Sequence, residues 1–279
     1  RQVDANQRLI PSPQDDILTM KIAPDGHLLW RRTYDNPAAG LNAIGYGVAI
    51  DRSHNVIVTG YQEVTAANTD IVLIKYGADS TPLWVATYGR EITNTDATID
   101  VGWGVAVDES GSIYVSGYVG RTTTSTLNGT DRLVRKYTPD GQRVEWSRII
   151  DGGTNDYGFG CALGPDGKLY VAGATLSTMV SRSFDLSLDV LDRRSGVPLL
   201  SVVTNVDHGD DYAWGVAADA AGNFVIVGQE NRSGDLLQAD NWSVRKYSGP
   251  PPVPPTPENV RVFPNPFRPA SAVGGTVKF

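Results

Sequence analysis

Residues 100–117, DVGWGVAVDESGSIYVSG, contain two runs of alternating side chains on either side of a polar turn. Alternation with a period of two is the pattern of a β-strand with one buried face. The ESG segment between the runs supplies residues that a tight hairpin turn can use. The stretch predicts an antiparallel hairpin, and it raises the question whether Asp100 and Trp103 belong to a binding site or to a structural repeat.

The same hairpin recurs along the chain at a nearly constant interval. The copies are IGYGVAIDRSHNVIVTG (44–60), VGWGVAVDESGSIYVSG (101–117), YGFGCALGPDGKLYVAG (157–173) and YAWGVAADAAGNFVIVG (212–228). Their aromatic residues lie 57, 56 and 55 residues apart, at Tyr46, Trp103, Phe159 and Trp214. A fixed period of this length indicates a repeat architecture, so Trp103 is first of all a repeated structural residue.

A second strand-like motif alternates with the hairpins. Its copies are DILTMKI (16–22), DIVLIKY (70–76), DRLVRKY (131–137), DLSLDVL (185–191) and NWSVRKY (241–247), and most are followed by a turn and a run with a tryptophan, at Trp30, Trp84 and Trp146. Each period of about 56 residues therefore holds four runs of strand length. We predict an all-β protein, a β-propeller of four-stranded antiparallel blades, with four to five blades in this chain. The blades fall near 16–34, 44–88, 101–149, 157–203 and 212–247.

The repeats resemble the SBBP repeat of bacterial β-propellers. Its unit reads roughly as a D-x-hydrophobic-V-K-Y strand, a D-G turn, an L-W strand and a D-x-G-x-G-V-A-V-D hairpin. The resemblance covers residues 16–247 and implies a propeller over residues 1–248. One unit departs from it at Asp189, Val190 and Leu200, so we expect an irregular edge in that blade.

The C-terminal segment differs in composition from the repeats. Residues 249–259 are rich in proline, which favours an extended linker that cannot join a β-ladder. Residues 260–279 resemble the opening of the immunoglobulin-like C-terminal domains of secreted bacterial proteins, with matches at 263–267 and Pro269. Such domains are associated with export and surface attachment, sometimes through a type IX secretion system. The resemblance implies an extracellular or cell-surface protein.

Composition argues against several classes of function. The net charge is −7 and no run of Lys or Arg occurs, so we expect no nucleic-acid partner. No apolar stretch reaches the length of a membrane span. The single cysteine, Cys161, excludes an internal disulfide and a multi-cysteine metal site. It occupies the place of Val48 and Val105 in other copies, which favours a small hydrophobic side chain over a nucleophile.

Three acidic residues precede the repeated aromatic residues by three positions. They are Asp100, Asp156 and Asp211, with Ala43 at the same place in the first hairpin. In a propeller they would surround one mouth of the central channel, where they could hold a cation such as calcium or another ligand. Alternatively, each carboxylate accepts hydrogen bonds from backbone amides of its own turn or the neighbouring blade. Repetition favours the structural interpretation, and we identify no catalytic or cofactor-binding residue.

Three functional hypotheses remain. The leading one is a secreted or cell-surface propeller that is not an enzyme and serves as a structural or adhesive module, with a protein or a surface glycan as partner. The alternative is a carbohydrate- or cation-binding propeller that uses the channel mouth or the loops at 61–69, 119–130 and 174–184. The third is an enzyme, such as a polysaccharide lyase or a quinone-dependent dehydrogenase, whose unrepeated polar groups would meet in a deep pocket.

Overall fold

The structure is a computed structural model that contains strands and turns. It describes residues 15–38, 40–65, 67–89, 98–121, 129–152, 155–165, 167–176, 183–204, 209–231, 240–247 and 260–263. The strands are β1 (Ile17–Ile22), β2 (Leu28–Tyr34), β3 (Ala43–Ile50), β4 (Val56–Thr65), β5 (Asn68–Tyr76), β6 (Pro82–Tyr88), β7 (Val101–Val107), β8 (Ile113–Gly120), β9 (Thr130–Tyr137), β10 (Val144–Ile150), β11 (Asp156–Leu163), β12 (Lys168–Leu176), β13 (Phe184–Asp192), β14 (Pro198–Thr204), β15 (Tyr212–Ala218), β16 (Phe224–Asn231), β17 (Asp240–Tyr247) and β18 (Val260–Phe263). Within these residues, no helix is long and apolar enough to cross a membrane.

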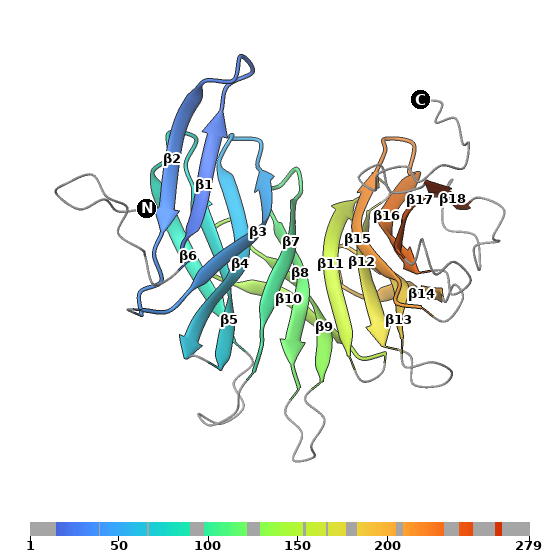
Figure 1. Ribbon diagram of the computed structural model, residues 1–279. Coiled ribbons are helices and arrows are strands. Elements are labelled where there is room, and N and C mark those ends of the chain that lie inside the picture. Colours follow the sequence, from blue (N-terminus) through green and yellow to red (C-terminus); the bar gives the residue numbers. More distant parts are fainter. Residues whose placement is uncertain are drawn as a thin grey trace, which may run out of the picture.

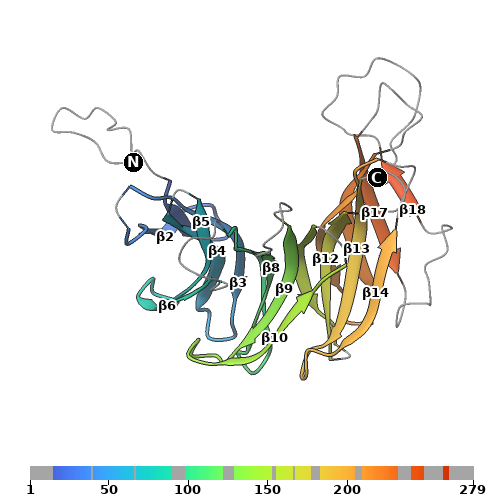
Figure 2. The ribbon, with the colours of Figure 1, turned by 90° about the horizontal axis from the view of Figure 1, so that it is seen from below.

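The strands form four-stranded antiparallel sheets in sequence order, which confirms the predicted all-β class and its structural unit (Figure 1). The first sheet is β3–β6, the second β7–β10, the third β11–β14 and the fourth β15–β18, and β1 pairs with β2 alone. The sheets stand side by side in an open arc, with β6, β10 and β14 along its outer side (Figure 2). The inner strands β3, β7, β11 and β15 contact one another in turn.

Each inner hairpin contains a β-bulge at its aromatic residue. The pairing register shifts between Gly45 and Gly47 in the first sheet and between Gly102 and Gly104 in the second. It shifts at the same place in the third and fourth sheets. A bulge adds an unpaired residue and turns its side chain out of the normal alternation. The repeated aromatic residue, which a glycine follows in every copy, therefore points out of the normal alternation in each sheet.

In three of the inner hairpins, an aspartate side chain accepts a hydrogen bond from a backbone amide across the turn. The backbone amide of Asn55 donates to Asp51 Oδ1 at 2.9 Å, that of Ser112 to Asp108 Oδ1 at 3.0 Å, and that of Asn223 to Asp219 Oδ1 at 2.9 Å. The turns also hold residues with positive φ, such as Gly111 at 85° and Gly222 at 81°. The expected tight turns between the two inner strands are present.

The hydrophobic core lies between neighbouring sheets. Ile71 and Leu73 of β5 pack with Ile113 and Val115 of β8, so the first and second sheets share one core. Burial of such side chains stabilises by about 1.5–3 kcal/mol each. The arc is therefore held together by sheet-to-sheet packing.

Tryptophans of the outer strands pack against the next sheet. A Cβ atom at Gly141 would lie 2.9 Å from the Trp84 ring, and one at Gly196 would lie 2.6 Å from Trp146. The indole of Trp146 also donates from Nε1 to the Arg193 carbonyl at 3.2 Å. These rings cover the outer turn of the following sheet, and only a glycine leaves room for them.

The third sheet is regular where the sequence predicted an irregular edge. β14 pairs with β13 with a register shift between Val190 and Leu191, the place at which β5 and β6 also shift. Leu200, at the position of the tryptophans, packs against the core between the third and fourth sheets. Asp189 is buried, and it forms an ion pair with Arg132 of the second sheet. The unusual residues therefore find partners in neighbouring sheets, and the strand pairing stays intact.

Residues 260–263 belong to the fourth sheet. They form β18, which pairs with β17 from Trp242 opposite Phe263 to Arg245 opposite Val260. The repeat at 212–247 supplies three strands, so its outer position was open for a further strand. The predicted linker at 249–259 and the remainder of the predicted C-terminal domain, 264–279, lie outside the described residues.

Candidate functional site

The bulged aromatic side chains form a continuous series across the inner strands. The ring centroids of Tyr46 and Trp103 are 4.3 Å apart in a stacked arrangement, those of Trp103 and Phe159 are 5.0 Å apart, and those of Phe159 and Trp214 are 4.5 Å apart. Such contacts stabilise by about 0.5–1.5 kcal/mol each beyond burial of their area. Trp103 is thus a wedge between neighbouring sheets and also part of one connected aromatic surface.

Further rings that sequence reasoning missed extend this series. Tyr118 lies 4.8 Å from Tyr157, Tyr157 lies 5.4 Å from Phe184, and Phe184 lies 5.3 Å from Tyr212, whose ring stacks on Trp214 at 5.1 Å. We call the whole set the aromatic row: Tyr46, Trp103, Tyr118, Tyr157, Phe159, Phe184, Tyr212 and Trp214. The available signal was that Tyr157 and Tyr212 begin two of the repeated hairpins.

The aromatic row is buried at its centre and open at two of its members. Phe159 is 4% exposed, whereas Tyr46 is 43% and Trp214 39% exposed. Burial raises the pKa of Tyr212 to about 12, and it also raises the pKa of Tyr46 and Tyr118. These hydroxyls are therefore protonated at neutral pH and can donate as well as accept hydrogen bonds.

Asp100 and Asp211 make equivalent structural hydrogen bonds. The Gly120 amide donates to Asp100 Oδ1 at 2.8 Å, and the Asn231 amide donates to Asp211 Oδ1 at 2.8 Å. Both carboxylates are buried. Each closes the end of its own inner hairpin, as the structural interpretation of the repeated aspartates requires.

Asp156 departs from this arrangement. The amide of Leu176, which occupies the place of Gly120 and Asn231, donates to the Asn155 carbonyl at 2.8 Å instead. Asp156 Oδ2 accepts from the Gly152 amide at 2.7 Å, while Oδ1 is buried without a hydrogen-bond partner. Burial raises the pKa of this carboxyl. Of the three predicted aspartates, Asp156 alone has an oxygen that its hairpin leaves unsatisfied.

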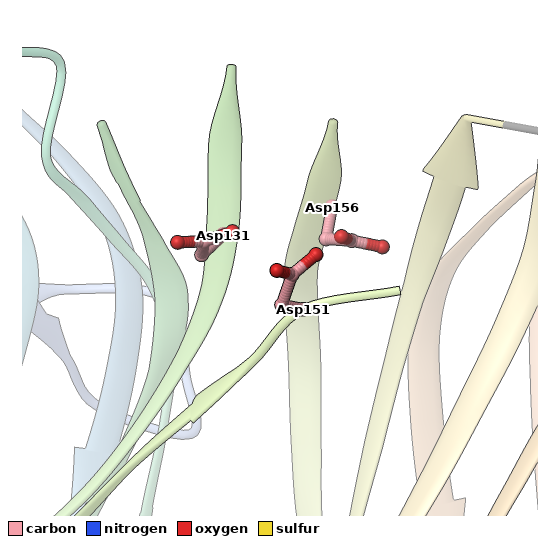
Figure 3. Close-up of side chains that lie close together, drawn as sticks. All are labelled: Asp131, Asp151 and Asp156. Carbon is pink, nitrogen blue, oxygen red and sulfur yellow. The ribbon is translucent and has the colours of Figure 1, made fainter. Parts of the chain in front are cut away.

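Asp156 is brought together with two acidic residues that the sequence did not single out. One carboxylate oxygen from each of Asp131, Asp151 and Asp156 lies within 4.8 Å of the others (Figure 3). We call these three residues the acidic cluster. Arg121 forms ion pairs with Asp131 and Asp151. The cluster combines three carboxylates with one guanidinium at the junction of the second and third sheets.

Cys161 and three loops are the remaining candidates from the sequence. Cys161 is partly buried against the core that contains Tyr114 and Trp146, and burial raises its pKa to about 11. A thiol with that pKa is almost wholly protonated at neutral pH, which suits a hydrophobic side chain and not a nucleophile. Of the loops considered for ligand binding, residues 66, 122–128 and 177–182 lie outside the described residues.

Solved structures similar to this chain are β-propeller-like proteins. A protein of unknown function from Dyadobacter fermentans has a TM-score of 0.51 and 11% sequence identity, over 74% of this chain and 66% of that chain. A quinohaemoprotein alcohol dehydrogenase from Comamonas testosteroni has a TM-score of 0.45 and 10% identity, over 80% of this chain and 47% of that one. A gluconolactonase from Xanthomonas campestris has a TM-score of 0.41 and 15% identity, over 85% of this chain and 66% of that one.

These similarities concern the fold. The chain spans between 47% and 66% of the lengths of those three structures. No family model matches the chain, and no curated protein is similar to it in sequence. The expectation that the protein is not an enzyme needs correction, because similar structures include a dehydrogenase and a gluconolactonase. Repeated residues of a scaffold do not exclude catalysis, since enzymes place their sites on the same kind of fold.

Proposed function

We propose that this protein is an extracellular carbohydrate-binding protein that attaches to surface glycans, and that the aromatic row is its binding surface. The observation that carries the proposal is the exposure of Tyr46 and Trp214 at 43% and 39%. Contiguous apolar side chains that are open to water often mark an interaction site, and ligand-binding surfaces are among these sites.

The chemistry of the row suits a sugar. One face of many pyranose rings presents C–H groups of slight positive charge, and the face of an aromatic ring carries negative charge. Trp214 and Tyr46 can therefore stack on sugar rings, each contact contributing about 0.5–1.5 kcal/mol. Because neighbouring rings hold them in place, little conformational entropy is lost when a ligand binds.

Hydrogen bonding adds selectivity to this stacking. Tyr46 and Tyr212 keep their protons, since burial raises the pKa of both phenols. Each hydroxyl can donate to a sugar oxygen or accept from a sugar hydroxyl. An aromatic platform bordered by a few polar groups is the usual composition of small-molecule sites.

The experiment is a glycan array probed with the parent protein and two matched variants. Trp214→Ala removes an exposed ring of the row, whereas Trp242→Ala removes a ring that is 51% exposed on β17, outside the row. We expect the parent and Trp242→Ala to bind the same glycans and Trp214→Ala to lose most of the signal. The absence of any bound glycan, or an equal loss in both variants, would refute the proposal.

The proposal also covers the repeat family, the C-terminal domain and the location of the protein. We propose that the arc is part of a β-propeller of SBBP-type repeats, supported by the phased motifs over residues 16–247. We also propose that an immunoglobulin-like export domain follows β18, supported by residues 264–267 of the predicted motif. Detection of the full-length protein on the cell surface or in the medium would support the extracellular location, and its retention inside the cell would contradict it.

A further inference from the structure

We propose that the acidic cluster binds one Ca²⁺ ion at the junction of the second and third sheets. The ligands would be the carboxylates of Asp131, Asp151 and Asp156. This site is separate from the sugar-binding surface and does not depend on it.

The three carboxylates come from different elements that packing brings together. Asp131 lies on β9, Asp151 follows β10, and Asp156 begins β11 of the next sheet. In the view of Figure 3, the Asp151 carboxylate lies between those of Asp131 and Asp156. A cation held here would link the second sheet to the third.

An unsatisfied oxygen of Asp156 is independent evidence that the acidic cluster binds a ligand. Asp156 is 1% exposed, and its Oδ1 has no hydrogen-bond partner. A buried polar atom without a partner destabilises the folded protein, and a charged one does so more strongly. The bond from the Gly152 amide to Oδ2, 2.7 Å long, holds the carboxylate in place. A cation at the cluster would supply the missing partner.

The acidic cluster differs from the corresponding residues at the other junctions between sheets. The strand pairing, continued along the sequence, identifies the residues that correspond to Asp131, Asp151 and Asp156. They are Asp16, Asp35 and Ala43 at the junction before the first sheet, Asp70, Gly89 and Asp100 at the next, and Asp185 and Asp211 at the last, where the residue after Thr204 lies outside the described residues. Two acidic residues recur at each of these junctions, and the second–third junction has three. The third carboxylate breaks the repeat, which a purely repeated structural bond does not explain.

The charge of the acidic cluster favours a divalent ion, and the spacing of its carboxylates admits calcium. Three carboxylates and the Arg121 guanidinium carry a formal charge of −3 + 1 = −2, which one divalent cation neutralises. Ca²⁺ lies about 2.3–2.6 Å from its oxygen ligands, so oxygens on opposite sides of it are about 4.6–5.2 Å apart. The ligand atoms lie within 4.8 Å of one another, a span that one Ca²⁺ ion can bridge. Mg²⁺ gives up its bound waters reluctantly, so it should bind this all-protein site more weakly.

The test is calorimetric titration of the metal-stripped protein with CaCl₂, alongside melting curves with calcium and with EDTA. We expect one saturable site, a higher melting temperature with calcium, and weaker binding of MgCl₂. Asp151→Asn should weaken calcium binding at least tenfold, and because Asp151 is exposed this variant should fold. Asp156→Asn should behave in the same way.

The matched control is Asp35→Asn, which changes the residue that corresponds to Asp151 at a junction with two acidic residues. It should bind calcium as the parent does. No binding at 1 mM (roughly the weak end of protein calcium sites), or unchanged binding by Asp151→Asn, would overturn the proposal. Glycan binding measured in EDTA is expected to persist, so failure of one proposal can be told from failure of the other.

Discussion

The ion pair between Arg132 and Asp189 offers a sharp test of how the sheets are joined. Both side chains are buried, and the pair links β9 of the second sheet to β13 of the third. Arg132 also contacts Ser187 and donates from Nε to the Tyr157 carbonyl at 2.9 Å. Removal of the carboxylate by Asp189→Ala leaves a buried guanidinium without its counter-charge.

The loss of stability expected for Asp189→Ala comes from the buried, unpaired charge of Arg132. Breaking a buried ion pair by removing one partner costs about 3–5 kcal/mol, whereas replacing both partners with apolar residues is often neutral. The junction before the first sheet provides that replacement, because Ile17 of β1 and Ile74 of β5 occupy the corresponding places and share one buried core. The double variant Arg132→Ile, Asp189→Ile should therefore regain most of the stability that Asp189→Ala loses.

Urea unfolding measures both quantities. With a slope of about 2 kcal/mol per M, a loss of about 4 kcal/mol lowers the urea midpoint by about 2 M. We expect that shift for Asp189→Ala and a shift of less than half that size for the double variant. A loss below about 1 kcal/mol for Asp189→Ala, or equal losses in both variants, would refute the argument that this pair satisfies a buried charge.

Three further predictions concern packing, the thiol and acid. Trp146→Ala should lower the free energy of unfolding by about 3–5 kcal/mol in urea melts, and Trp146→Leu, which copies Leu200 of the third sheet, by clearly less. Cys161, whose pKa burial raises to about 11, should not react with Ellman's reagent at pH 8 until the protein is unfolded, and fast reaction of the native protein would contradict its placement. Burial opposes ionisation of Asp108, but hydrogen bonds from hydroxyls and backbone amides outweigh it and hold its pKa below the usual value. Its contribution is therefore present above about pH 4 and lost as the pH falls further, so the stability difference between parent and Asp108→Asn should shrink in acid.

The repeat allowed the sheets to be predicted from sequence. Alternation indicated the strands, the aromatic residues at a constant interval marked the inner hairpins, and the period identified Trp103 as a repeated structural residue. Local pattern was sufficient here because each strand pairs with its neighbour in the chain. The same reasoning failed for the fourth sheet, whose outer strand β18 comes after the predicted linker and carries no repeat motif.

The candidate sites were harder to predict from the sequence than the fold. Asp156 was a candidate, but Asp131 and Asp151 belong to another sheet, and only packing shows that their carboxylates meet. Asp189 was noted only as a departure from the repeat, since its partner Arg132 lies 57 residues away. Contacts between sheets depend on which faces meet, and a single sequence does not encode them as a local pattern.

The binding of sugar by the aromatic row is tested most directly by tryptophan fluorescence during a glycan titration. Trp103 and Trp214 lie in the row, whereas Trp242 lies outside it on β17. A glycan that binds the row should give a saturable change in emission that persists in Trp242→Phe and disappears in the double variant Trp103→Phe, Trp214→Phe. No change in the parent with any glycan, or the same change in the double variant, would contradict the proposed function.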